Sequence, residues 1–383
     1  MDHGRPVHGH ALCAHDLLGR AARSHAGGGQ ELGKAHRAAT IDSMDLELLT
    51  SRLHELGEPA YRERQVWRWA AQGAGGFAEM TDLPLDLRAA LEETVPYSSL
   101  TLIQEAHSSD ATVKALFETA DRRPVEAVLM RYRDGRRSLC LSSQSGCPLT
   151  CTFCATGQMR FGRNLTASEI LDQALHFRRS GDVDHAVFMG MGEPMMNLDA
   201  VLAACARLPA IGIGNRHTAI STVGWIPGIE RLTAQPMPIR LALSLHAADE
   251  ALRSQLMPVN DRYPLRDVLS ACRAYYERKR RMVFVEYVML AGVNDSYAQA
   301  RQLAEVLDPR SFKVNLIPYN PTDSAYAGSS AKAIEAFRAE LERHGIGATV
   351  RVTRGRDIAA ACGQLAAQGS TAAVSPAAGA SRA

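Results

Sequence analysis

The sequence predicts an α/β fold in which a partial (βα)6-type barrel follows a small N-terminal helical domain and a β-hairpin connector. Three observations support this fold class. Short β-type runs alternate with helical stretches over most of the chain, which is the pattern of a parallel sheet. Two β-type runs separated by a polar turn precede that alternation, and helical periodicity precedes both.

The bulk composition is that of a soluble globular protein, with 46% hydrophobic and 22% charged residues among 383. A single core stops growing near roughly 250 to 300 residues, so one large domain with a smaller one is expected. No apolar run reaches the roughly 18 residues that a membrane span needs. The N-terminus also lacks the apolar core of a signal peptide, so we expect a cytoplasmic protein without a membrane partner.

The two ends of the chain differ from the rest in composition. Residues 1–43 hold six of the thirteen histidines and a glycine run without periodicity, and we expect a disordered extension there. Met44 opens an amphipathic stretch and is an alternative start of translation. Residues 367–383 are rich in Ala, Gly and Ser and are predicted to be a disordered tail.

Residues 44–100 are predicted to form the helical accessory domain and residues 101–136 the hairpin connector. Helical periodicity runs over 44–56, stops at Gly57, resumes from Tyr61 and returns over 85–94 after a proline turn. In the connector, the β-type runs 112–117 and 125–132 flank a polar turn.

The alternating pattern predicts a barrel over residues 137–366. Chemistry in such folds gathers at the carboxyl ends of the strands. The candidate strands are 138–142, 185–190, 217–222, 239–246, 283–290, 312–318 and 349–353. The candidate helices are 167–179, 198–208, 265–277, 297–307 and 331–344.

Three of the eight cysteines stand in one loop after the first candidate strand, as Cys147-x3-Cys151-x2-Cys154. Three thiolates in so short a loop leave one iron of a 4Fe–4S cubane free. That iron could bind the amino and carboxylate groups of S-adenosylmethionine (SAM) and pass it an electron. A zinc site is the alternative, although no second cysteine pair supplies a fourth ligand. The motif resembles that of the radical-SAM superfamily, including Phe153 before the third cysteine.

A second set of residues is predicted to bind SAM. Gly192 and Glu193 stand in Gly-x-Gly-Glu-Pro at the end of the second candidate strand, where glycine permits close approach and the carboxylate suits an ammonium group. Alone this would be an ordinary turn, but it resembles the Gly-Glu-Pro motif of the superfamily. Small polar residues at later strand ends are more often turn caps when isolated, but together they resemble the ribose and carboxylate contacts of the superfamily. These residues are Ser221, Ser244, Leu245, His246 and Asn315.

Two further cysteines narrow the resemblance. Cys140 precedes the cluster motif, and Cys362 lies in Ala-Cys-Gly-Gln-Leu past the last strand, close in sequence to Arg354, Arg356 and Asp357, where a thiolate could be exposed and stabilised. Over residues 44–365 the chain resembles the dual-cysteine radical-SAM RNA methyltransferases, RlmN and its relative Cfr. Cysteines in helical stretches are ordinary core residues. These are Cys205 and Cys272.

The resemblance implies a mechanism that uses two SAM molecules per turnover. Cys362 takes a methyl group from the first molecule by displacement. The second is cleaved at the cluster to a 5′-deoxyadenosyl radical, which abstracts hydrogen from methylated Cys362, and the resulting methylene radical adds to the adenine. Cys140 then removes the carbon-2 proton and forms a transient disulfide with Cys362. Glu126 matches the proton acceptor of the family, although an isolated Glu is usually a surface residue.

The resemblance also implies the partners, with the helical accessory domain over residues 44–100 expected to bind RNA. The substrates would be an adenosine in the peptidyl-transferase region of 23S rRNA and adenosine 37 of tRNA, flipped out to reach the site. A one-electron reductant such as flavodoxin and a monomeric state are expected. The net charge of +2 does not itself indicate RNA binding, which would rest on arginine patches that are more often solvated faces. The patches lie at residues 62–68, 131–137 and 278–281.

Three alternatives remain at this point. Pro194 after Glu193 and the stretch 140–164 favour methylation of carbon 2, as in RlmN, over carbon 8, as in Cfr, whereas 220–228 and 319–322 have some likeness to Cfr. A radical-SAM enzyme acting on a small molecule is a second alternative. A non-enzymatic binding module held together by its cluster is the third. Neither of the last two accounts for Cys140 and Cys362.

Overall fold

The computed structural model describes residues 46–366, so the predicted extension and tail lie outside the described residues. Three helices open the described chain: α1 Leu46–Glu55, α2 Tyr61–Gln72 and α3 Leu85–Thr94. Helix α2 ends where Gly73 adopts the left-handed conformation that favours glycine. Its Glu63 carboxylate lies 3.0 Å from the Arg207 guanidinium on α6, which joins these helices to the rest of the fold.

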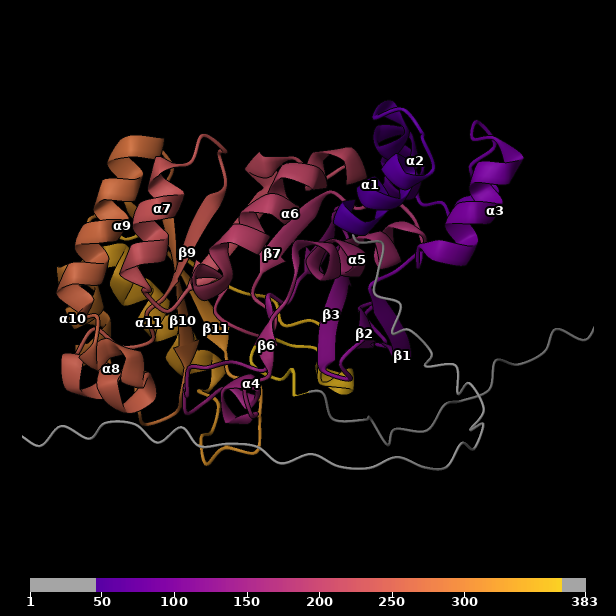
Figure 1. Cartoon of the computed structure of the whole chain (residues 1–383). Coiled ribbons are helices and arrows are strands. Elements are labelled where there is room, and N and C mark those ends of the chain that lie inside the picture. The colour runs from indigo at the N-terminus through magenta and orange to yellow at the C-terminus, as the bar shows by residue number, and fades with distance from the viewer. Residues whose placement is uncertain (1–45, 367–383) are drawn as a thin grey trace, which may run out of the picture. The chain divides into compact units, whose positions relative to one another are not determined.

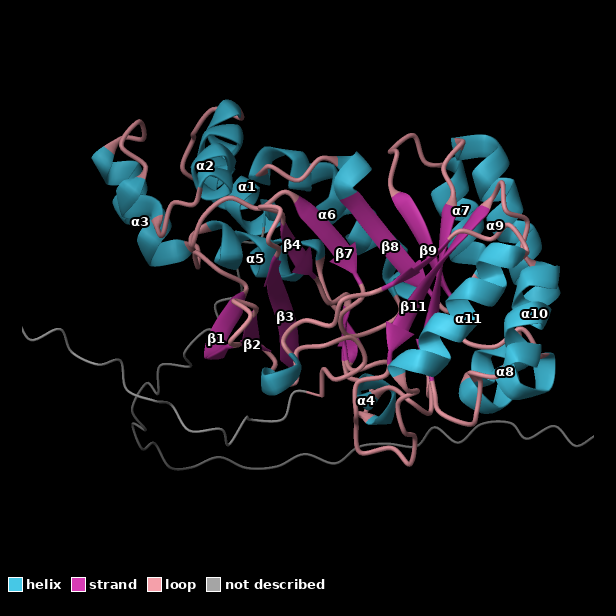
Figure 2. Cartoon of the chain, turned by 180° about the vertical axis from the view of Figure 1, so that it is seen from behind, coloured by secondary structure: helices cyan, strands magenta, loops and turns pink. Residues whose placement is uncertain are grey.

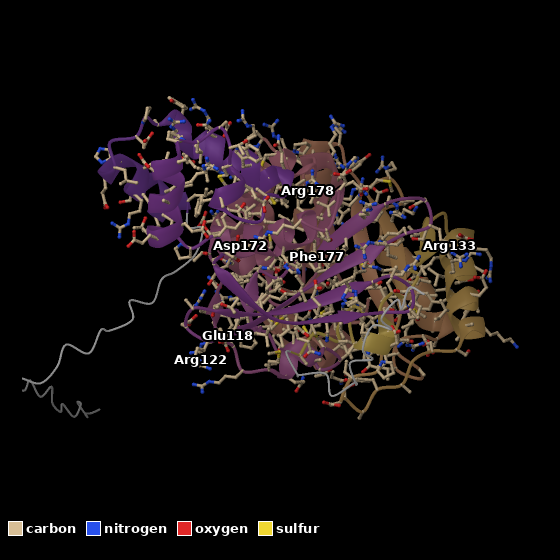
Figure 3. The ribbon with its side chains drawn as sticks, turned by 90° about the vertical axis from the view of Figure 1, so that its right-hand side faces the viewer. Glu118, Arg122, Arg133, Asp172, Phe177 and Arg178 are labelled. Carbon is tan, nitrogen blue, oxygen red and sulfur yellow. The ribbon has the colours of Figure 1, made fainter. Side chains whose placement is uncertain are left out.

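Four antiparallel strands follow: β1 Leu100–His107, β2 Val113–Thr119, β3 Pro124–Arg131 and β4 Arg137–Cys140. The predicted hairpin corresponds to β2 and β3 and is confirmed. Strand β1 was not predicted, because a register shift after Leu102 interrupts the alternation of apolar and polar residues along it. In Figure 3, Glu118 and Arg122 at the β2–β3 turn lie at the opposite end of the strands from Arg133 in the β3–β4 turn.

A parallel sheet continues from β4 in the order β4-β7-β8-β9-β10-β11-β12, which confirms the seven predicted barrel strands. The helices α5, α6, α7 and α9 cover its outer face (Figure 1). The parallel strands after β4 are β7 His185–Phe188, β8 Thr218–Thr222, β9 Arg240–Ser244, β10 Val283–Met289, β11 Phe312–Pro318 and β12 Ala348–Val350. The helices are α5 Ala167–Arg178, α6 Leu198–Ile211, α7 Ile226–Ala234, α8 Glu250–Leu256, α9 Leu265–Lys279, α10 Tyr297–Val306 and α11 Ala331–Arg343.

Short elements surround the carboxyl ends of these strands. A two-stranded ribbon, β5 Gln144–Ser145 with β6 Arg163–Asn164, brackets the loop that carries the three clustered cysteines. The one-turn helix α4 Ala155–Gln158 closes that loop and lies beyond the carboxyl ends of the parallel strands (Figure 2). A capping box between Thr166 and Glu169 then starts α5.

One continuous hydrophobic core runs from Leu49 in α1 to Ala348 in β12. Because the N-terminal helices and the barrel share this core, the predicted domain boundaries at residues 100 and 136 do not coincide with a gap between cores, and the division stays a prediction. Asp172 on α5 is buried in this region and accepts hydrogen bonds from the backbone and hydroxyl of Ser99, just before β1 (Figure 3). No helix in residues 46–366 is both long and apolar enough to cross a membrane.

Candidate active site

A cavity at the carboxyl ends of the parallel strands brings together most of the predicted site residues. It is enclosed by the cysteine loop, by the ends of β7, β8 and β9, by β10 and by the segment after β12. The predicted residues that line it are Cys147, Cys151, Cys154, Gly192, Glu193, Ser221, Ser244, His246 and Cys362.

The cysteine loop is folded tightly against the barrel. A Cβ atom on Gly157 would lie 2.8 Å from the Cys151 carbonyl oxygen, so the loop requires glycine there. The Thr152 amide donates to the Leu256 carbonyl at 3.0 Å. The Phe153 ring meets the His246 ring edge-on, with 4.8 Å between centroids. These contacts hold the three thiols against the strand ends.

Cys151 is buried, and Cys147 and Cys154 are partly buried. Burial raises the pKa of Cys147 to about 12 and raises those of Cys151 and Cys154 as well. A metal cluster supplies the positive charge that turns such thiols into ligands. No group of three or more His, Cys, Asp or Glu side chains in residues 46–366 is arranged to hold a metal ion. Ligands of a cubane stand wider apart, because each thiolate binds a different iron. Three cysteine thiols of one loop that all line one cavity are the donor set that an iron–sulfur cluster uses.

Glu193 is one of two buried carboxylates, with Glu286, that line the cavity. Its oxygens accept hydrogen bonds from the Met195 amide at 3.1 Å and the Val223 amide at 3.0 Å, which tie the ends of β7 and β8 together. Gly192 before it has φ of 97°, and a Cβ there would lie 2.5 Å from the Gln144 side chain. Burial raises the pKa of Glu193 to about 7. A cationic ammonium group beside it would favour the ionised form.

Strand β9 ends in a row of cavity residues. The hydroxyls of Ser221 and Ser244 lie 3.3 Å apart. His246 has φ of 61°, and its Nδ1 accepts a hydrogen bond from the Val288 amide at 3.0 Å. Burial and the nearby Arg253 lower the pKa of His246 to about 3, so the ring is neutral and its Nε2 carries the proton. Leu245 is fully buried and does not line the cavity.

Asn315 lies outside this cavity, in a neighbouring one. Its side chain donates to the Glu286 carboxylate at 2.9 Å, because Glu286 and Asn315 are paired across β10 and β11. Glu286 itself is buried and lines the main cavity, and the sequence reasoning missed it. Glu286 lies in the middle of a strand, where ordinary core residues of a barrel also lie. The one sequence feature that could have marked it as a site residue is a carboxylate within an apolar run.

Cys362 lines the main cavity and also a second, smaller one, which it shares with Cys140 and Arg351. Both cysteines are free thiols, and no disulfide joins them. Burial raises the pKa of Cys140 to about 12, and the pKa of Cys362 is also raised, although Cys362 as a whole residue is exposed. The Arg351 guanidinium opposes both shifts. The structure thus brings the two predicted cysteines to one cavity.

Arg354, expected beside Cys362, does line the smaller cavity with it, and Arg351 is a second cation there. Arg354 lies 3.8 Å from the Asp110 carboxylate, and Asp357 accepts from the Ser108 hydroxyl at 2.5 Å and the Ser109 amide at 3.0 Å. These residues fasten the chain before Cys362 to the β1–β2 loop. Arg351 was not predicted as a site residue. It follows β12 directly, and only the three-dimensional path of the chain after β12 places it near the two cysteines.

The cysteine loop and the Cys362 segment are bonded to each other. The Ala155 amide donates to the Gly363 carbonyl at 2.8 Å, and the Thr156 hydroxyl donates to the Leu365 carbonyl at 2.5 Å. On the other side, the Asn320 amide group donates to the Cys362 carbonyl at 3.2 Å. The position of Cys362 therefore depends on the conformation of the cysteine loop.

Glu126 is buried on β3, with its carboxylate 2.9 Å from the Lys114 ammonium group. Lys114 also donates to the Ala359 carbonyl at 3.4 Å, three residues before Cys362. Glu126 does not line either of the cavities that contain Cys362. Its role as a proton acceptor stays a prediction.

Comparison with known proteins agrees with this geometry. A model of the radical SAM superfamily matches residues 141–304, and one of the ribosomal RNA large subunit methyltransferase N-terminal domain matches residues 41–96. Relatives named probable dual-specificity RNA methyltransferase RlmN include one from Thermus thermophilus, 45% identical over 84% of this chain and 92% of its own length. Another from Chloroflexus aurantiacus is 45% identical over 84% and 91%.

A solved structure is also similar. The crystal structure of a radical SAM methyltransferase from Sphaerobacter thermophilus superimposes with a TM-score of 0.81 at 42% identity, over 86% of this chain and 100% of that one.

Proposed function

Because the chain belongs to the RlmN family of dual-specificity RNA methyltransferases in the radical-SAM superfamily, we propose that it methylates carbon 2 of one adenosine in 23S rRNA and of adenosine 37 in tRNA. One observation carries the proposal. Cys362 lines both the cavity of the three clustered cysteines and the cavity of Cys140. A methyl carrier on protein sulfur must be reachable from both places.

Membership of the superfamily implies an iron–sulfur cluster and SAM. We assign a 4Fe–4S cluster to Cys147, Cys151 and Cys154. When bound, it supplies the electron that cleaves SAM to a radical. Glu193 would hold the SAM ammonium group, and Ser221, Ser244 and His246 its remaining polar groups. Leu245 would contact SAM only through its backbone. Asn315 would not contact SAM directly and would act through its hydrogen bond to Glu286.

The remaining chemistry belongs to the chain itself. Cys362 thiolate attacks the SAM methyl carbon, so a sulfur–carbon bond forms and S-adenosylhomocysteine leaves. After the methyl carbon has joined the adenine, the adduct must give up one electron, which the cluster, when bound, would accept, and Cys140 takes the carbon-2 proton. Once Cys140 has passed that proton on, its thiolate attacks the Cys362 sulfur, so the disulfide forms, the sulfur–carbon bond breaks and the released methyl carbon takes up a proton. A cellular reductant then restores both thiols.

Other roles complete the proposal. Glu126 would accept a proton, as its position in the sequence motif suggests, and its carboxylate lies 2.9 Å from the Lys114 ammonium group. Flavodoxin or a similar one-electron carrier would reduce the cluster. We expect the enzyme to act as a cytoplasmic monomer and to use two SAM molecules per turnover.

The two cysteines provide the test. Cys362→Ala should abolish RNA methylation and keep the cluster absorbance, because Cys362 is not among the proposed ligands. Cys140→Ala should accumulate protein joined covalently to RNA, detected as a slow band that nuclease removes. Cys272→Ala, a buried core cysteine, is the matched control and should methylate normally. Loss of the cluster in Cys362→Ala, or uncrosslinked protein in Cys140→Ala, would contradict the assignment.

A further inference from the structure

A third cavity, of about 420 Å³, opens on the inner side of the sheet near the amino ends of β7, β8 and β9. In Figure 2 these strand ends lie at the opposite end of the sheet from α4. We call this cavity the basic trough, because six of its lining residues are arginine or histidine. They are Arg136, His185, Arg216, His217, Arg240 and Arg351.

The positive charge of the trough is only partly balanced. Glu286 is the only carboxylate among the lining residues that the structure describes, and it lies 3.6 Å from Arg351. Arg136 is paired with Asp134 at 2.9 Å. Within residues 46–366, by contrast, neither Arg216 nor Arg240 forms an ion pair with a carboxylate. An anion could therefore bind these two guanidinium groups without displacing a protein partner.

Neighbouring cations strengthen this charge. Arg281 donates to the Arg216 carbonyl at 3.1 Å, which brings its guanidinium to the same region. Burial and the charge of Arg281 lower the pKa of Arg240 from its ordinary value. Crowding of cations in a partly buried site is unfavourable for the free protein and is relieved when a polyanion binds.

Flat side chains alternate with the cations in the trough. The Arg240 guanidinium lies over the Phe284 ring, 4.8 Å from its centroid, and the Arg136 guanidinium lies 4.5 Å from the Tyr132 centroid. The His185 and His217 rings are stacked, with centroids 4.5 Å apart. Guanidinium planes and aromatic rings are the groups on which unpaired RNA bases stack. The trough thus offers contacts for both parts of a nucleotide.

The trough borders the cavity of the two reactive cysteines. Met130, Met189, Arg351 and Val352 line both. Arg351 stands at this border, in the cavity that also contains Cys140 and Cys362. A nucleotide in the trough would therefore be a near neighbour of the base undergoing reaction.

We propose that the basic trough binds the RNA backbone beside the target adenosine, with Arg216 and Arg240 contacting phosphate groups. The inference rests on the proposed function, since it takes RNA as the substrate. Contacts to phosphates fix the position of an RNA without reading its sequence. The trough would thus serve both substrates of a dual-specificity enzyme.

The test compares RNA binding by charge-removing and charge-retaining variants. The probe is a short hairpin RNA with an unpaired loop adenosine, and its Kd is measured over a range of KCl concentrations. We expect Arg216→Gln with Arg240→Gln to raise the Kd about tenfold and to lower the slope of log Kd against log salt by about 1 to 2. Arg216→Lys with Arg240→Lys should stay close to wild type. The exposed Arg122→Gln, at the far turn, is the control.

The outcomes separate this inference from the proposed function. Cluster absorbance shows whether the Gln double variant has folded. If the folded variant keeps the wild-type Kd and salt slope, the proposal that the basic trough binds RNA is wrong. A variant that loses inorganic phosphate binding but still binds the hairpin normally would also overturn it, since the site would then hold a free anion. A wild-type enzyme that binds the hairpin through the trough but never methylates RNA would overturn the proposed function instead.

Discussion

Glu193, the proposed partner of the SAM ammonium group, shows how the fold fixes one side chain. Both of its oxygens accept backbone hydrogen bonds, which fix the carboxylate at the cavity wall. Its position in a Gly-Glu-Pro motif made it predictable from the sequence. The same holds for Ser221, Ser244 and His246, because each ends a strand whose apolar run is visible.

Glu193→Gln should weaken SAM binding, since it removes the charge that complements the ammonium group. A hydrogen bond to a charged group contributes roughly 1.5 to 3 kcal/mol, so we expect a Kd increase of about ten- to a hundredfold. Isothermal titration of the reconstituted protein with SAM measures this. Glu305→Gln, an exposed glutamate on α10, should leave the Kd unchanged. An unchanged Kd in Glu193→Gln would mean that the ammonium group binds elsewhere.

Asn315 and Arg351 mark the limit of prediction for single residues. Asn315 was expected at a strand end as Ser244 is, yet it lies in the middle of β11 and lines the basic trough instead. It is paired there with Glu286 and Thr349. Which level of a barrel a residue occupies depends on the register between strands, and one sequence does not contain that information. Arg351 follows β12 and reaches the cysteines only because the barrel curves.

At the scale of elements, the cysteine loop and the Cys362 segment act as one unit. The sequence separates them by some two hundred residues, so no local pattern could indicate their contact. The Thr156 hydroxyl is buried and donates to the Leu365 carbonyl. The position of Cys362, the proposed methyl carrier, should therefore depend on this bond.

Thr156→Val keeps the side-chain shape and removes the donor. The lost bond leaves a carbonyl unsatisfied, at a cost of about 1 to 3 kcal/mol. We expect faster hydrogen exchange in residues 358–366, about fivefold or more, and slower RNA methylation. Thr233→Val is the control, because it loses a comparable bond to the Ile229 carbonyl in α7. Equal exchange in both variants would show that the segment is held without Thr156.

The junction between α5 and β1 makes stability depend on pH. Burial raises the pKa of Asp172 from 3.8 to about 6. The folded protein thus retains the Asp172 proton that the unfolded chain releases, so the contribution of Asp172 to stability falls as pH rises from about 4 to about 6.

Asp172→Asn removes this dependence. Each pKa unit corresponds to about 1.4 kcal/mol, so the difference in unfolding free energy between wild type and variant should fall by on the order of 3 kcal/mol over that range. Urea unfolding followed by circular dichroism at several pH values measures it. Asp199→Asn, an exposed site, should run parallel to wild type. A constant difference between wild type and Asp172→Asn would refute the buried-proton explanation.

At the scale of the whole molecule, the α/β fold and all seven barrel strands were predictable, because alternation of apolar strands and amphipathic helices is a local signal. Strand β1 was missed, since its bulge and its exposed Leu102 and Ile103 hide the alternation. The curvature of the sheet places the amino-terminal strands and the segment after β12 around one set of cavities. This curvature is a property of the whole fold, so no local sequence pattern predicts it. It creates both the two-cysteine cavity and the basic trough.

The most direct test of the central claim is mass spectrometry of ribosomal and transfer RNA from a strain that lacks this gene. The account predicts that 2-methyladenosine disappears from 23S rRNA and from tRNA, and that it returns with the wild-type gene but not with Cys362→Ala. Disappearance of 8-methyladenosine instead, or unchanged RNA in the deletion strain, would contradict it.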